Sequence, residues 1–286
     1  MFIDLHTHSS ASDGSCSPSE ILAFGSQLGL GALGLTDHDT VSGIPEFLEL
    51  SEKYPGISVV PGVEVSVYYK NSSIHILGLF IDHNDEALGT MLQEIRKNRD
   101  NRNVHIISKL NGMGYEITLE EVEAVAGGES VGRPHFAKIL IEKGYFEESQ
   151  DVFDRCLKRG APAYCGRVLP TPAEAINAIH GAGGLAFWAH PLHREEGERS
   201  YVRSVLADFM TLGLDGIEAY YTTFSEKQHK LIMETAAEYN LLISGGTDFH
   251  GDNQPKIRLG SGYGDLKVPF TVLENIRLAH SKKKNK

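Results

Sequence analysis

The N-terminal sequence MFIDLHTHSSASDG places two histidines one residue apart and an aspartate five residues later. Alternate residues of a β-strand point to the same face, so His6 and His8 would project together after the apolar run FIDLH. Two imidazoles aimed at one point are a common way to hold a divalent metal ion. The HxH spacing alone is a weak signal, because histidines also occupy protein surfaces and ordinary hydrogen bonds.

Further residues of the same chemical types stand in or directly after other apolar runs. They are Asp13, His38 in TDHDT, Glu64 in PGVEVS, His75 in SIHILG, His190 in AHP, and Asp248 and His250 in TDFHG. Taken singly, each has a structural alternative. Asp37 and Asp39 could cap a loop beside His38, whereas His75 could be a hydrogen-bonded core histidine and His190 could merely end a strand. Taken together, the six histidines and three carboxylates predict a metal cluster.

The elements that must position these residues alternate along the chain. Apolar runs predict seven strands, at residues 2–6, 31–39, 56–67, 73–80, 183–191, 213–221 and 241–251. Helical patterns occur between several of them, at residues 17–29, 41–54, 172–183 and 224–240. Ser17 followed by Pro18 predicts a capped start for the first of these helices. The alternation predicts a parallel α/β sheet or barrel, with the cluster at the C-terminal ends of its strands.

This alternation breaks at residues 84–164. Four helical patterns occur there without a strand between them, at residues 85–114, 118–128, 133–145 and 148–160. We therefore predict a barrel domain formed by residues 1–83 and 165–286, with an inserted helical subdomain at residues 84–164 that acts as a lid. Arg96, Arg99 and Arg102 on the first inserted helix could touch a longer nucleic acid, but a solvated helix face is the simpler interpretation.

Composition sets further limits. The 286 residues carry a formal net charge of −11, which argues against broad electrostatic binding to nucleic acid. No apolar run reaches the roughly 18 residues of a transmembrane helix, and no secretory signal is evident, so we expect no membrane contact. Three cysteines without CxxC spacing fit a reducing cytoplasm. The basic end SKKKNK is interpreted as a solvated, frayed tail.

The motifs DLHTHSSASDG, TDHDT, PGVEVS, HILG, AHP and GTDFHG follow one another along the chain. Together they resemble the PHP family, named for polymerase and histidinol phosphatase domains, and the resemblance runs from Phe2 to about Gly260. It implies a distorted seven-stranded (β/α) barrel with the inserted helical subdomain described above. It also implies a centre of two or three divalent metal ions.

The resemblance assigns the nine residues to three metal sites. The first site takes His6, His8, Glu64 and Asp248. Glu64 would bridge to a second site that also takes His75 and His190. The third site takes Asp13, His38 and His250. Within this set the candidates for catalytic residues are Asp13, His38, Glu64, His190 and His250. Hard ions such as Mn²⁺ suit the carboxylates and Zn²⁺ or Fe²⁺ suits the histidines, so three ions of Mn, Zn or Fe are expected.

Two segments of the inserted region, VGRPHFAKILIEKGY and PAYCGR, resemble the branch of the family that acts on nucleotides and 5′ ends of RNA. The implied activity is hydrolysis of 3′,5′-bisphosphonucleosides or 5′-phosphorylated oligoribonucleotides by a metal-activated hydroxide. Nucleotide or short RNA substrate and phosphate are the expected partners, with no obligate protein partner. We expect Arg133 to contact a phosphate, because a guanidinium matches phosphate bidentately. His135 is a candidate for substrate contact or protonation of the leaving group.

Three other functions stay open from the sequence. A histidinol-phosphate-type phosphatase is disfavoured because those enzymes generally lack the GRPH element found here. A non-catalytic PHP module is disfavoured because all nine ligand types are present. An amidohydrolase would need a metal-bridging lysine near a strand end, and none of the predicted strand ends carries one.

Overall fold

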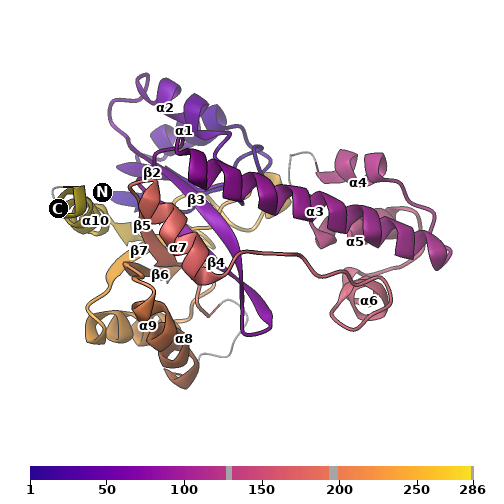
Figure 1. Cartoon of the computed structure of the whole chain (residues 1–286). Helices are drawn as coiled ribbons and strands as arrows, with labels where there is room; N and C mark the ends of the chain where they lie inside the picture. Colours follow the sequence, from indigo (N-terminus) through magenta and orange to yellow (C-terminus); the bar gives the residue numbers. More distant parts are fainter. Residues whose placement is uncertain (127–130, 193–198, 285–286) are drawn as a thin grey trace.

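The strands form one sheet that curls into a nearly closed barrel (Figure 1). The computed structural model describes residues 1–126, 131–192 and 199–284, and within them the strand order is β7-β6-β5-β4-β3-β2-β1-β8. The strands are β1 Phe2–Asp4, β2 Ala32–Leu35, β3 Ser58–Tyr69, β4 Ser72–Leu79, β5 Leu185–Trp188, β6 Gly216–Tyr221, β7 Leu242–Gly246 and β8 Val268–Pro269. The segments that continue β1 and β7 meet through a bridge between Thr7 and Phe249, and Leu5 N donates to Gly245 O at 3.1 Å.

Each of the seven predicted strands corresponds to an observed strand, but the sheet differs from the prediction in two ways. β8 is an eighth strand of two residues, paired antiparallel with β1, and it is too short to give an apolar run. β4 runs antiparallel to both β3 and β5, so the sheet is mixed rather than parallel. The cause is a tight hairpin between β3 and β4, in which Lys70 and Asn71 have φ angles of 41° and 69°.

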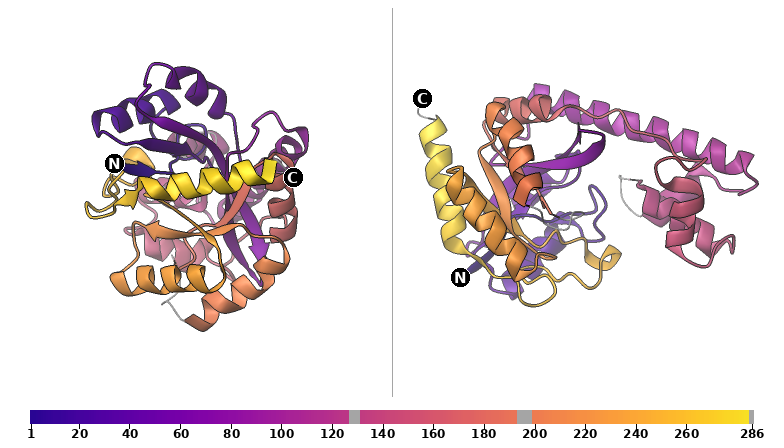
Figure 2. Two further views of the ribbon diagram at one scale, coloured as in Figure 1. Left: turned by 90° about the vertical axis from the view of Figure 1, so that its left-hand side faces the viewer. Right: turned by 90° about the horizontal axis from the view of Figure 1, so that it is seen from below.

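Helices cover the outside of the barrel (Figures 1 and 2). They are α1 Pro18–Gln27, α2 Ile44–Ser51, α7 Pro172–Gly181, α8 Arg199–Thr211, α9 Glu226–Glu238 and α10 Phe270–Lys284. The predicted start of α1 is confirmed, because Ser17 and Glu20 form a capping box. The prediction of a frayed basic tail is wrong as far as Lys284: α10 extends to that residue, and Lys283 Nζ pairs with Asp215 Oδ1 at 3.1 Å.

The described part of residues 84–164 is helical, as the sequence predicts. Its elements are α3 Glu86–Gly112, α4 Leu119–Ala126, α5 Arg133–Glu142, α6 Ser149–Val152 and a π-helical turn at Phe153–Leu157. The 27 residues of α3 span about 40 Å and carry the other helices away from the barrel (Figure 2). The first turns of α3 pack on the barrel core through Leu88, Leu92 and Ile95. Its last turns pack with α4, α5 and α6 around a separate apolar cluster, and we call the described residues of 102–164 the lobe.

The structure also bears on membrane contact. Among the described helices, none combines the length and the apolar surface that crossing a bilayer requires. The three cysteines Cys16, Cys156 and Cys165 are not bonded to one another.

Candidate metal centre

The nine predicted ligand residues lie together at one end of the barrel. Residues in the loops after strands β1, β2, β5 and β7 supply His6, His8, Asp13, His38, His190, Asp248 and His250. The prediction that Glu64 ends its strand is wrong, because β3 continues to Tyr69 as one arm of the hairpin with β4. Glu64 therefore lies in the middle of β3, and His75 lies on the neighbouring strand β4.

Four side chains converge at the centre of this cluster. The ligand atoms of His6, His8, Glu64 and Asp248 all lie within 4.8 Å of one another. Glu64 Oε2 lies 3.3 Å from the Nε2 atoms of both His6 and His8, and Asp248 Oδ1 lies 3.0 Å from His8 Nε2. All four of these buried atoms lack a hydrogen-bond partner. Buried nitrogen and carboxylate atoms that converge without a hydrogen-bond partner fit a divalent metal ion.

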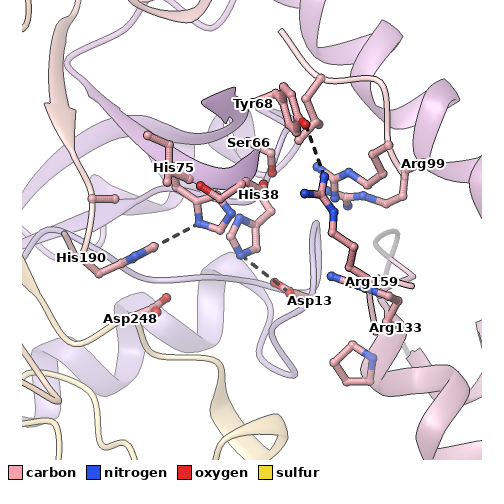
Figure 3. A pocket seen from close by; sticks show the side chains of 18 of the residues that line it. Asp13, His38, Ser66, Tyr68, His75, Arg99, Arg133, Arg159, His190 and Asp248 are labelled. Atoms are coloured by element: carbon pink, nitrogen blue, oxygen red, sulfur yellow. Dashed lines mark hydrogen bonds and ion pairs between the residues drawn. The ribbon is translucent and has the colours of Figure 1, made fainter. Parts of the chain in front are cut away.

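A second group shares His8 with the first. The ligand atoms of His8, Asp13, His38 and His250 lie within 4.8 Å of one another. His250 Nε2 is 3.3 Å from Asp13 Oδ1, and His38 Nε2 is 3.9 Å from Asp13 Oδ2 (Figure 3). His250 Nδ1 donates a hydrogen bond to the backbone carbonyl of Asp248 at 2.8 Å, which leaves Nε2 to face Asp13. The structure thus brings together Asp13, His38 and His250, which the sequence analysis assigned to one site, and adds His8.

Glu64 connects the first group to a third. Its Oε1 lies 2.9 Å from His75 Nδ1 and 2.7 Å from His190 Nε2, and its Oε2 lies 3.0 Å from His38 Nδ1. His75 Nδ1 and His190 Nε2 are 3.2 Å apart (Figure 3). One fully buried carboxylate thus contacts imidazoles of more than one group. A carboxylate placed in this way could be shared as a ligand between two divalent metal ions.

The charges of the cluster keep its carboxylates ionised. Burial opposes ionisation of Glu64, but the imidazoles of His38 and His75 hold the pKa of Glu64 well below its usual range. The pKa of Asp13 is lowered against its burial by His38 and His250. Burial lowers the pKa of His75 to about 4, so its imidazole is neutral at pH 7. Against burial, Glu64 and Asp13 raise the pKa of His38 to about 9, so a metal ion that binds His38 must displace a proton.

Glu218 is a candidate that the sequence analysis missed. Its fully buried side chain projects from β6, where Oε1 accepts a hydrogen bond from His6 Nδ1 at 2.9 Å. Its Oε2 accepts a hydrogen bond from the backbone N–H of His190 at 2.7 Å. The bond to Nδ1 leaves His6 Nε2 to face Glu64 and Asp248, and outer carboxylates commonly orient metal-binding histidines in this way. In the sequence, this role is indicated by a single glutamate inside the apolar run GIEAYY.

Replacing Glu218 with glutamine is expected to weaken metal binding by about 10- to 100-fold, because the amide orients and polarises the His6 ring less strongly than a carboxylate. The measurement is the Mn²⁺ dissociation constant of metal-stripped protein. Glu226→Gln on the exposed side of α9 is the matched control. Equal Mn²⁺ affinities for wild type and Glu218→Gln would refute an orienting role for this carboxylate.

A cavity of about 1160 Å³ opens between the cluster and the lobe. Its barrel side is lined by Asp13, His38, His75, His190, Asp248 and His250. It is also lined by Arg102, Arg133, Lys158 and Arg159, which we call the cationic wall, and by Arg99 and Arg167. Figure 3 shows Arg133 and Arg159 of this wall across the cavity from the ligand residues. An anion that reaches the cluster would therefore lie opposite a row of guanidinium and ammonium groups.

The prediction of a solvated face for Arg96, Arg99 and Arg102 is wrong. Arg99 is 4% exposed and Arg102 is 6% exposed, because α3 passes over the loop that follows β2. Arg99 forms an ion pair with Asp39, and Arg96 Nη1 donates to the backbone carbonyl of Asp39 at 2.6 Å. Arg102 donates to the backbone carbonyl of Val131 at 3.2 Å. Burial and the neighbouring arginines lower the pKa of Arg102 to about 9, so it remains a cation at pH 7.

Asp37 has the loop-capping role that the sequence suggested for it. Its carboxylate accepts hydrogen bonds from the N–H of Ser9 at 2.7 Å and from the hydroxyls of Ser9 and Ser12 at 2.7 and 2.5 Å. It thereby fixes the loop that carries Asp13. Asp39, on the other side of His38, has partners on three separate chain segments.

Arg133 and His135 occupy the first turn of α5. Arg133 lines the cavity, where Nη1 donates to the Leu157 carbonyl at 3.3 Å and the guanidinium lies 5.6 Å from the centre of the Tyr164 ring. His135 Nδ1 accepts a hydrogen bond from the N–H of Gly132 at 3.0 Å, so its ring caps the helix. Burial lowers the pKa of His135, which leaves a neutral ring with its proton on Nε2.

The barrel carries histidines and carboxylates at one end, next to a cavity lined by cations. This combination is typical of metal-dependent phosphoester hydrolases. The chain belongs to the PHP domain family, whose model matches residues 4–163. The match contains six of the nine ligand positions, the last of them His75, whereas His190, Asp248 and His250 lie beyond it.

Relatives and solved structures extend the similarity over nearly the whole chain. The chain is 36% identical over 247 residues to a 5′-3′ exoribonuclease of Haemophilus influenzae, which covers 86% of this chain and 89% of the relative. It is 33% identical over 254 residues to a 3′,5′-nucleoside bisphosphate phosphatase of Chromobacterium violaceum, with 88% of each chain covered. A protein of Bifidobacterium adolescentis described as a metal-dependent phosphoesterase superimposes with a TM-score of 0.80 at 29% identity, covering 97% of this chain and 96% of the other. The chain is accordingly a hydrolase of phosphoester bonds.

A second solved structure carries a different functional name. It is an amidohydrolase of Chromobacterium violaceum, solved with bound sulfate and no metal, and it superimposes with a TM-score of 0.84 at 29% identity. The alignment covers 97% of this chain and 96% of that chain. The three ligand groups found in the described residues of the present protein consist of histidine, aspartate and glutamate side chains.

Proposed function

We propose that the protein hydrolyses phosphate esters of nucleotides, either 3′,5′-bisphosphonucleosides or 5′-phosphorylated oligoribonucleotides, at a centre of three divalent metal ions. The observation that carries this proposal is one cavity with three ligand groups on one side and the cationic wall on the other. The similar exoribonuclease and nucleoside bisphosphate phosphatase support the choice of nucleotides as substrates.

We assign three ions of Mn²⁺, Zn²⁺ or Fe²⁺ to these residues. His190 is in none of the three ligand groups, and it is included because its Nε2 lies 2.7 Å from Glu64 Oε1. One ion would be held by His6, His8, Glu64 and Asp248, a second by Glu64, His75 and His190, and a third by Asp13, His38 and His250. Divalent ions bound there supply Lewis-acid chemistry, which offsets phosphate charge and yields hydroxide near neutral pH. By formal count, the three carboxylates offset half of the positive charge of three divalent ions. The site therefore attracts an anion although the whole chain carries a net charge of −11.

The other contacts of the substrate in this proposal come from the side of the cavity opposite the ligand groups. Arg102 and Arg133 would bind a phosphate other than the one being cleaved, since both line the cavity. Tyr68 and Tyr164 line the same cavity and offer ring faces for base stacking. We accordingly retain residues 84–164 as a substrate-selecting lid on a barrel of residues 1–83 and 165–286, in a cytoplasmic protein.

Arg133→Ala is expected to lower kcat/KM for a nucleotide substrate by about 10- to 100-fold, because a charge-assisted hydrogen bond contributes about 1.5–3 kcal/mol. The bound metal content should stay at the wild-type value, since Arg133 lies across the cavity from the ligand groups. Lys138→Ala removes an exposed cation from the same helix and is the matched control. Unchanged kinetics in Arg133→Ala would remove this residue from the substrate site.

A panel of substrates tests the proposed function itself. Phosphate or nucleotide release by Mn²⁺-reconstituted protein would be compared for 3′,5′-bisphosphoadenosine, a 5′-phosphorylated oligoribonucleotide and histidinol phosphate, with metal-stripped protein as the control. We expect turnover of one or both nucleotide substrates and its loss on stripping. Preference for histidinol phosphate would overturn the choice of nucleotides, and full metal occupancy without turnover of any substrate would favour a non-catalytic module.

A further inference from the structure

Asp39 ties together three segments that are far apart in the sequence. It follows His38 in the loop after β2 and is completely buried. Its carboxylate accepts hydrogen bonds from the N–H and hydroxyl of Ser66 in β3 at 2.7 and 3.0 Å. It also forms ion pairs with Arg99 of α3 and, at 3.3 Å, with Arg167.

The two arginines mark the two crossings between barrel and lobe. Arg99 lies on α3, which leads out to the lobe, and Arg167 lies on the segment that returns to α7. Both guanidinium groups thus pair with one barrel carboxylate, and the Arg99 and Asp39 side chains are only 5% and 0% exposed. An ion pair shielded from water in this way is geometrically specific and weakly screened by salt.

A second bridge between barrel and lobe is weaker. Arg159 of the lobe donates to the hydroxyl of Tyr68 in β3 at 3.3 Å, in an exposed position (Figure 3). It connects a neutral group through one long bond, whereas Asp39 engages two cations at a buried position. The buried pairs are therefore the contacts best placed to set the angle of the lobe.

We propose that Asp39 is a positioning residue that fixes the lobe so that the cationic wall faces the metal centre. The inference rests on the proposed function, because it assumes that the wall binds a phosphate of the substrate. His38 directly precedes Asp39 in the same loop, so this loop positions both a candidate metal ligand and the residue that anchors the lobe. Asp39 touches no substrate in this account and acts through Arg99 and Arg167.

The direction in which KM changes in Asp39→Asn distinguishes a positioning role from a purely electrostatic one. Removing a negative charge close to the cationic wall would by itself strengthen binding of an anionic substrate and lower KM. Loss of the anchor displaces the wall, and a misplacement of about 1 Å lowers the reaction rate by about 10²-fold. We therefore expect kcat/KM for 3′,5′-bisphosphoadenosine to fall by about 10²-fold, with KM raised rather than lowered. The kcat for phenyl phosphate, which has no second phosphate for the wall to bind, and the metal content should match wild type.

Arg167→Gln provides an independent variant on the returning segment, and it keeps the pair between Asp39 and Arg99. We expect a smaller increase in KM. Because Arg167 also lines the cavity, this variant supports the proposal only together with faster hydrogen exchange in residues 163–170, and it keeps the proposal testable even where Asp39→Asn fails to fold. Glu238→Gln, which breaks the exposed pair with Arg203, is the control and should leave both substrates unaffected. An unchanged or lowered KM for 3′,5′-bisphosphoadenosine in the folded variants would overturn the proposal, as would an equal loss with phenyl phosphate.

Hydrogen exchange tests, without an activity measurement, whether Asp39 and Arg167 hold the returning segment in place. In Asp39→Asn and Arg167→Gln, backbone amides of residues 163–170 should exchange faster than in wild type, while those of α7 and α9 should be unchanged. Exchange at the wild-type rate in residues 163–170 would show that the pairs do not hold the returning segment. Wild-type protein that turns over no nucleotide would refute the proposed function instead, and the exchange data would still decide whether Asp39 anchors the lobe.

Discussion

Replacing Glu64 with glutamine is expected to reduce the kcat for nucleotide hydrolysis by at least about 10³-fold. This effect is larger than the 10- to 100-fold loss expected for Glu218, which orients a ligand histidine but is not itself a ligand. Glu64 is the carboxylate shared between ligand groups, and its two oxygens lie 2.7–3.3 Å from imidazole nitrogens. Glutamine keeps the volume of the side chain but presents an NH₂ donor on one side and removes a negative charge. The measurements are kcat at saturating Mn²⁺ and the number of bound ions per chain, which we expect to fall.

The control for this variant is Glu234→Gln, which changes an exposed glutamate of α9 that pairs with Arg199. It should retain wild-type turnover and wild-type metal content. Wild-type kcat in Glu64→Gln would contradict the assignment of Glu64 as a bridging ligand. Loss of activity with all ions still bound would assign Glu64 a role in proton transfer rather than in metal binding.

Removing the divalent ions is expected to abolish phosphate release and to lower the melting temperature by about 5 to 10 °C. An ion at 100 times its Kd stabilises the native state by about 2.7 kcal/mol, which corresponds to several degrees for a chain of this size. Glu64 is completely buried and the Asp248 side chain is 14% exposed, and one oxygen of each lacks a hydrogen-bond partner, so loss of the ion leaves these oxygens without a partner in the folded protein. The measurement is thermal unfolding and phosphate release before stripping, after stripping and after addition of Mn²⁺.

Chelator saturated beforehand with Mn²⁺ is the control for this experiment, since it should change neither the melting temperature nor the turnover. Metal-stripped protein that releases phosphate at the wild-type rate would contradict metal-dependent hydrolysis. An unchanged melting temperature with lost activity would mean that the ions bind too weakly to stabilise the fold at the concentrations used.

The ligand residues were accessible to sequence reasoning because metal binding restricts residue type. Histidines and carboxylates at the ends of apolar runs, such as His6 and Asp248, stand out against the residues that strands require. The exact placement of Glu64 was less accessible, since the extension of β3 depends on the hairpin at Lys70 and Asn71. That hairpin also makes β4 antiparallel to β3, whereas the alternation of strands and helices predicted a parallel sheet.

The residues that support the centre could not be found in the same way. Glu218, Asp39 and Arg167 owe their roles to partners far away in the chain, and no local spacing reveals such pairs. Arg99 and Arg102 lie on a helix whose sequence is polar on most sides, which is typical of a solvated element. Their burial follows from the path of α3 across the barrel mouth, a feature of tertiary structure that helical periodicity does not encode.

The most direct test of the central claim is a titration of metal-stripped protein with Mn²⁺, in which bound ions per chain and phosphate release from 3′,5′-bisphosphoadenosine are measured in the same samples. A centre of three ions predicts that turnover is absent in the stripped protein, rises as occupancy approaches three ions per chain and saturates there. Turnover that saturates at one ion per chain, or three bound ions without hydrolysis of a nucleotide, would contradict the account.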